Sequence, residues 1–147
     1  MGFLMNKDSI TVLQKCISGC KMAVKSMDQL VEYTEDKNLR HVIMLYKKKH
    51  DEIKEQCADL LPGDLNKTSE PGIISSTVSR FTIDMKMIVK NDNHCITKIL
   101  MNGCNMGIQS LSEELNNHPD ASEQVSRMVR QLIQLEEKLI DDLKPYI

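Results

Sequence analysis

The sequence predicts an all-α protein, an antiparallel four-helix bundle with an additional helical segment before the third bundle helix. Apolar residues recur at alternating steps of three and four along four stretches of the 147-residue chain, which is the period of a helix with one buried face. The alternating runs and hairpin turn pairs typical of β-strands are absent. Residues 1–147 are predicted to form a single domain, since a chain of this length buries about two thirds of the surface that its unfolded form exposes.

The first two helices follow from their apolar stripes and their ends. The first is predicted over residues 9–35, with Asp8 or Ser9 as its cap. The connection over residues 36–38 is short, so the second helix, predicted over residues 39–61, should return antiparallel. Pro62 and Gly63 end it. The stripe of the second helix contains a histidine, His50, among apolar residues.

The second half of the chain is helical in pattern from residue 72 to residue 116. One straight helix of that length would reach about 66 Å, whereas the first two helices would reach roughly 35–40 Å. A break is therefore predicted at residues 91–93, Asn-Asp-Asn, which favour caps. It separates an additional segment over residues 73–90 from the third bundle helix over residues 94–115. The last helix is predicted to begin after Asp120, with Glu123 in a capping box, and to stop before Pro145.

Composition excludes several classes of partner. The net charge is −2, and the only basic run, residues 47–49, is followed by Glu52 and Glu55 at helical spacing, so no nucleic-acid partner is predicted. The longest uncharged stretch, residues 99–112, is too short to span a membrane, and residues 1–6 lack the features of a signal peptide. Five cysteines without a Cys-x-x-Cys motif indicate reduced thiols and a cytoplasmic location.

The motif of a di-iron bundle is missing. Such a centre uses a Glu-x-x-His pair on two of its helices. The residues three positions before His41, His50, His94 and His118 are Asn38, Lys47, Asn91 and Leu115. No di-iron centre is therefore expected, and no catalytic residue is predicted, because nucleophile and phosphate-loop motifs are absent as well.

The most specific functional hypothesis is a site for a soft metal ion on the third bundle helix. His94, Met101 and Cys104 follow one another at steps of seven and three, near one helix face. Imidazole, thioether and thiolate groups suit Cu(I) or Zn. The competing interpretation is that Met101 and Cys104 are core residues and that His94 lies near a helix start.

His50 also has two interpretations. It is either a metal ligand or acid–base group, or a core histidine that donates to a neighbouring helix. Glu136 borders the apolar face of the last helix, so a contact between Glu136 and His50 across the bundle is a hypothesis.

The helix pattern resembles the ferritin-like superfamily, and it is similar to small uncharacterised ferritin-like proteins of low-GC Gram-positive bacteria. The resemblance rests on His94 followed by Ile99-Leu100-Met101, on the run from Asn105 to Ile108, and on the chain end over residues 135–147. It implies a four-helix core with an extra segment, and a family in which some members have lost the metal centre. No di-iron ligands are carried over, because the Glu-x-x-His positions depart from the family pattern.

The sequence thus predicts a non-catalytic ferritin-like bundle that acts as a binding or structural module, with self-association or another protein as its partner. The alternative is a metal-handling protein that uses His94, Met101 and Cys104, together with His50 and Glu136.

Overall fold

The computed structural model describes residues 5–63 and 92–147. These residues form four long helices, α1 (Lys7–Glu32), α2 (Lys37–Leu60), α4 (Asn93–Asn117) and α5 (Glu123–Leu143), followed by a short 3₁₀ helix, η3 (Lys144–Tyr146). Within the two described stretches there is no strand, which confirms the predicted all-α four-helix bundle. The additional segment predicted over residues 73–90 lies outside the described residues.

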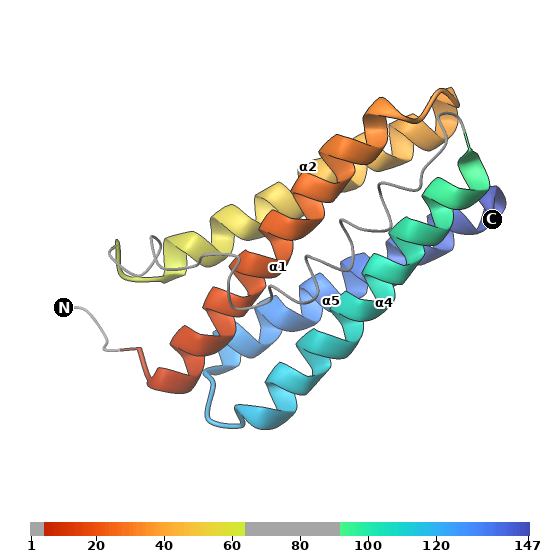
Figure 1. The fold of residues 1–147 in the computed structure, drawn as a ribbon. Coiled ribbons are helices and arrows are strands. Elements are labelled where there is room, and N and C mark those ends of the chain that lie inside the picture. The colour runs from red at the N-terminus through yellow and green to blue at the C-terminus, as the bar shows by residue number, and fades with distance from the viewer. Residues whose placement is uncertain (1–4, 64–91) are drawn as a thin grey trace.

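The helices form two antiparallel pairs that pack side by side (Figure 1). The contacts within the pairs α1–α2 and α4–α5 are the most extensive, those between α2 and α5 are fewer, and those between α1 and α4 are fewer still. Helix α2 ends and α4 begins at opposite ends of the bundle, so these two helices run in the same direction (Figure 1). Neighbours around the bundle are therefore all antiparallel, and the α1–α4 side is the most loosely closed.

The cap predicted for α1 was wrong. Asn6, not Asp8 or Ser9, has the extended backbone of a cap, and its Oδ1 accepts a hydrogen bond from the backbone N of Ser9 at 2.8 Å. The Asp8 carboxylate instead accepts from the backbone N of Asp120 at 3.3 Å. Asn6, Asp8 and Ser9 all make hydrogen bonds to the segment between α4 and α5, and these contacts decide which of them caps the helix.

The cap predicted for α5 was wrong for the same reason. Ser122 caps this helix by accepting from the backbone N of Val125 at 3.2 Å, while Asp120 stays in the preceding turn. The backbone N of Ser122 also donates to Ser9 Oγ at 2.8 Å. The start of α4, in contrast, was predicted correctly, because Asp92 accepts from the backbone N of Cys95 at 3.0 Å and the helix begins at Asn93.

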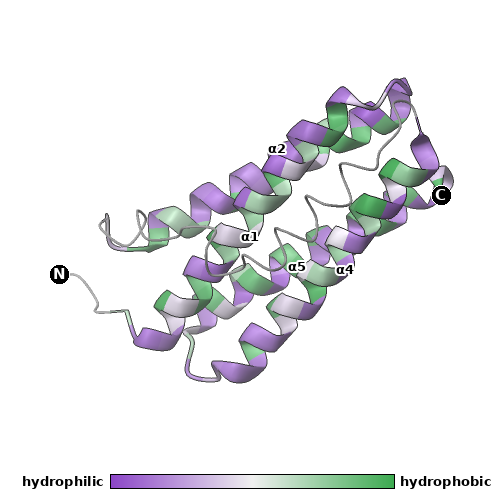
Figure 2. Ribbon diagram, in the orientation of Figure 1, coloured by the Kyte–Doolittle hydropathy of each residue, from purple (hydrophilic) through white to green (hydrophobic). Residues whose placement is uncertain are grey.

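The apolar faces of the four helices turn toward one another and their outer faces are polar (Figure 2). The buried side chains form two clusters, one at each end of the bundle. The first cluster contains Met27, Leu30, Val31, Leu39, Ile43, Tyr46, Ile96, Ile99, Leu100, Cys104, Leu139 and Leu143. The second contains Val12, Leu13, Cys16, Ile17, Cys20, Cys57, Leu61, Leu111, Val125, Val129 and Leu132. All five cysteines lie in the described residues and none forms a disulfide bond.

Candidate functional site

The two buried clusters are separated at one level of the bundle, where Leu135 on α5 is partly buried and packs against both of them. Between the two clusters, α2 contributes His50 and α5 contributes Glu136, while α1 contributes residues 21–26 and α4 contributes residues 105–110. His50 and Glu136 are both buried, although their side chains are polar. A polar layer in the middle of an apolar bundle costs free energy unless its groups are paired, so its contacts define what this level can do.

His50 and Glu136 pair across the bundle, which confirms the contact hypothesised from the sequence. The Nε2 atom of His50 contacts Oε1 of Glu136, and the two side chains are 1% and 9% exposed. The Nδ1 atom of His50 lies 2.7 Å from the backbone O of Tyr46, one turn earlier on α2. Because a carbonyl only accepts, Nδ1 carries a proton and donates it there. Both ring nitrogens are therefore engaged.

The environment of this pair favours its charged form. Burial lowers the pKa of His50, but the hydrogen bond to Glu136 and the negative charge of that carboxylate outweigh burial, so the pKa of His50 lies above its ordinary value of 6.5. Cys104 on α4 faces the same carboxylate. Burial raises the pKa of the Cys104 thiol strongly, and the charge of Glu136 and a hydrogen bond to it raise the pKa further. Cys104 thus stays a protonated thiol that donates to Glu136.

Gly107 leaves the remaining side of the Glu136 carboxylate uncovered by a side chain from α4. A Cβ atom added at Gly107 would lie 3.6 Å from Oε2 of Glu136 and 3.7 Å from its Cδ and Cγ atoms. On α1, a Cβ added at Gly19 would meet no described atom within 4 Å. Gly107 therefore leaves room for one more atom beside this buried carboxylate, and Gly19 leaves open space on α1.

A pocket of about 200 Å³ opens at this level, mainly between α1 and α4. Its walls are mostly apolar, and His50, Cys104 and Glu136 contribute polar groups to them. The described residues that line it are Lys15, Gly19, Cys20, Met22, Ala23, Ser26, Met27, His50, Leu100, Gly103, Cys104, Met106, Gly107, Ser110, Leu111, Glu113, Glu114, Leu132 and Glu136. An apolar pocket with a few convergent polar groups and a shifted pKa is the kind of place where small molecules bind.

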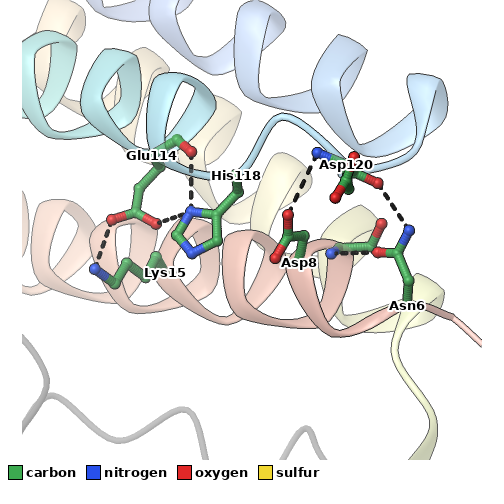
Figure 3. Close-up of polar contacts among 7 residues, drawn as sticks. Asn6, Asp8, Lys15, Glu114, His118 and Asp120 are labelled. Carbon is green, nitrogen blue, oxygen red and sulfur yellow. Dashed lines mark hydrogen bonds and ion pairs between the residues drawn. The ribbon is translucent and has the colours of Figure 1, made fainter.

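A second buried carboxylate lies at one end of the pocket. Glu114 on α4 accepts from Nζ of Lys15 on α1 at 2.5 Å (Figure 3). Its other oxygen, Oε2, lies 3.2 Å from Nδ1 of His118, but this nitrogen is also 3.0 Å from the backbone O of Glu114. The carbonyl takes the hydrogen bond, so Oε2 has an ion-pair contact and no hydrogen-bond partner. The Lys15–Glu114 contact joins α1 to α4 where these helices have few other contacts.

The structure brings together three of the five residues in the predicted metal site. Cys104, His50 and Glu136 meet at the polar layer, and Met101 is partly buried against the first cluster. His94 is exposed at the start of α4, ten positions before Cys104, which is about 15 Å along a helix axis. Among residues 5–63 and 92–147, no group of three or more His, Cys, Asp or Glu side chains has a geometry that could hold a metal ion.

The sequence reasoning missed the wall of the pocket. It gave Gly19 and Ala23 no role. The signal that could have found them is positional. On α1 and α4, Ala23 and Gly107 lie in the interval between the two clusters, where the other two helices have His50 and Glu136.

We expect the free energy of unfolding to fall as the pH rises through the raised pKa of His50. A group with a higher pKa in the folded state contributes stability fully below its unfolded pKa, and that contribution is lost as the pH passes the folded value. Urea unfolding at steps of pH from 6.5 upward measures this loss. The slope should disappear in His50→Gln and remain in His41→Gln, since His41 is exposed on the same helix. An equal slope in all three proteins would contradict the assignment.

No protein-family model, no curated protein and no solved structure matches this chain. Over the described residues, no helix combines the length and the apolar character needed to cross a membrane.

Proposed function

We propose that this protein is a non-catalytic ferritin-like bundle whose pocket between α1 and α4 binds a small molecule. The observation that carries the proposal is the interruption of the core, where a pocket of about 200 Å³ opens beside a buried His50–Glu136 pair. An engineered apolar cavity of about 150 Å³ holds benzene, so a pocket of this size accommodates a ligand with one ring. A purely structural bundle gains nothing from an unfilled core.

The order of the helices supports the ferritin-like assignment. Bundles of that type contain one long crossover connection, which places two consecutive helices in the same direction. Helices α2 and α4 also run in the same direction (Figure 1). The absence of Glu-x-x-His at all four histidines supports a member without a di-iron centre.

Filling the pocket from Gly19 tests the proposal. Gly19→Leu adds a side chain toward space that holds no described atom within 4 Å, and leucine has a better helix propensity than glycine. Toluene, a neutral one-ring probe, is titrated into the protein and followed by amide chemical shifts. We expect Gly19→Leu to weaken toluene binding at least about tenfold, because the added side chain occupies the volume that the probe needs.

The matched control is Gln29→Leu, which adds the same side chain to an exposed position of α1 outside the pocket. It should bind toluene as the original protein does. Equal binding by Gly19→Leu and Gln29→Leu would contradict the proposal. Nuclear Overhauser contacts from the Gly19 amide to residues 64–91, and none to toluene, would also contradict the proposal, since the chain itself would then occupy the pocket.

The second candidate is the metal-handling function. The observation in its favour is the sulfur content of the same pocket, to which Cys20, Met22, Met27, Cys104 and Met106 contribute. Thiolate and thioether groups select Cu(I). His50 is a poor ligand here because both of its ring nitrogens are engaged. Elemental analysis of protein purified without added metal decides between the candidates, since stoichiometric copper or zinc would favour this one.

Self-association and a cytoplasmic location complete the proposal. Met44 and Leu45 on α2 are 48% and 40% exposed, and adjacent exposed apolar side chains are common at contacts between protein copies. Five cysteines without a disulfide bond are in keeping with a reducing compartment. Light scattering over a range of concentrations measures whether the chain associates.

A further inference from the structure

We propose that the ligand of the pocket is a small organic cation, a protonated amine on a body of about one ring, whose ammonium group binds the Glu136 carboxylate beside Gly107. This inference rests on the proposed function, because it names the chemical class of the molecule that the pocket takes. It follows from three features of the pocket: an accessible side of one carboxylate, the balance of charge along the wall, and the available volume.

The first feature is the position of Oε2 of Glu136. Oε1 is held by Nε2 of His50, which fixes the carboxylate, while Oε2 is the atom closest to the missing Cβ of Gly107, at 3.6 Å. Gly107 and Glu136 both line the pocket. A ligand atom located where other residues carry Cβ would therefore lie close to a carboxylate oxygen that is surrounded by apolar walls. A donor from the ligand would bind there with little competition from water.

The second feature is the charge of the wall. Among the described residues that line the pocket there are three carboxylates, those of Glu113, Glu114 and Glu136, against one lysine, Lys15, and one titratable histidine, His50. With His50 protonated the balance is three negative charges against two positive charges, and with His50 neutral it is three against one. Lys15 is already paired with Glu114 and His50 with Glu136, so among the described lining residues no cation remains to receive an anionic ligand. A cation is attracted in either protonation state and an anion is repelled.

The third feature is size. A pocket of about 200 Å³ with apolar walls admits a ring and one substituent, and it gains most of its affinity from burying that ring. The ammonium group then decides between ligands of the same shape. An alcohol could also donate a hydrogen bond to the carboxylate, but only the ammonium adds the attraction between opposite charges, which is strong where apolar walls exclude water.

Three ligands of nearly equal shape test the inference: benzylamine, benzyl alcohol and benzoate. Each is titrated into the full chain and followed by amide chemical shifts. We expect benzylamine to bind at least about fivefold more tightly than benzyl alcohol, and benzoate to bind the weakest. In Glu136→Gln the advantage of benzylamine over benzyl alcohol should disappear while benzyl alcohol still binds. The glutamine amide keeps the shape and donates to the Nε2 atom of a neutral His50.

Gly107→Ala is the second variant, and it keeps the inference testable if Glu136→Gln does not fold. The added methyl group is in ordinary contact with the carboxylate and improves helix propensity, so the fold is retained. It occupies the space next to Oε2, and it should reduce the affinity for benzylamine more than the affinity for benzyl alcohol.

The outcomes separate this inference from the proposed function. Equal affinities for benzylamine and benzyl alcohol, or tighter binding of benzoate, would overturn the cation assignment and leave the pocket as a site for neutral or anionic molecules. An amine advantage that persists in Glu136→Gln would overturn the role of this carboxylate. Binding of none of the three ligands, together with toluene binding that Gly19→Leu does not weaken, would overturn the proposed function and the inference together.

Discussion

Replacing His50 with leucine is expected to lower the free energy of unfolding by about 3–5 kcal/mol. The side chain of Glu136 is 9% exposed and loses its charged partner in this variant. The carboxylate must then stay charged in an apolar layer or take up a proton, and both routes cost free energy. Chemical denaturation at neutral pH measures the loss.

The double variant His50→Leu/Glu136→Leu should recover most of this loss or exceed the original stability. Two leucines have volumes close to those of the residues that they replace, and an apolar pair avoids the cost of burying charge. The matched control is the surface pair of Lys144 and Asp141, whose side chains are 65% and 69% exposed. Asp141→Ala should change stability by less than about 1 kcal/mol. A double variant no more stable than His50→Leu alone would contradict this account.

The cost of burying the His50–Glu136 pair bears on the function of this bundle. If an apolar pair joins the two core clusters at lower cost, stability does not explain why this bundle places a histidine and a glutamate at their junction. The same layer contains Gly107 on α4, which does not fill the core either. A layer that gives up stability on three helices is what a binding site inside a bundle requires. The double variant should therefore be stable and should lose the preference for benzylamine.

The helices and the His50–Glu136 contact could be predicted from the sequence because both depend on the period of one chain. Steps of three and four place His50 between Tyr46 and Cys57 on the inner face of α2, and they place Glu136 between Leu132 and Leu139 on that of α5. The start of α4 could be predicted because Asp92, the residue just before the helix, is itself the cap. Each of these features is local, so the residues that determine it are close together in the sequence.

The pocket and the caps of α1 and α5 could not be predicted in the same way. A pocket is a volume left over between helices, and its size depends on residues of α1 and α4 that are far apart in the chain. By residue type, the predicted caps Asp8 and Asp120 are as suitable as the observed caps Asn6 and Ser122. They do not cap the helices because they contact each other, and this contact between distant parts of the chain is not visible in local propensity. The predicted metal site included His94 because the spacing of residues along one helix shows which of them share a face. It does not require those residues to lie close together along the helix axis.

Replacing Leu39 with alanine is expected to lower the free energy of unfolding by about 2–5 kcal/mol. Leu39 is fully buried in the first cluster, away from the pocket, and its loss leaves a cavity that the neighbouring side chains fill only in part. The comparison is Leu45→Ala, which deletes the same atoms from the same helix at a position that is 40% exposed. In dilute protein this second variant should change stability by less than about 0.5 kcal/mol.

The pair of leucine variants also tests which surface of α2 is covered in solution. A small effect of Leu45→Ala at every protein concentration means that this face of α2 stays in water and contradicts self-association through it. A cost that grows with protein concentration means that a second copy covers Leu45, because association stabilises the folded state by mass action. Leu39→Ala should cost the same at all concentrations, since its cavity lies inside one bundle. Equal and concentration-independent losses in both variants would contradict the packing of α2 described above.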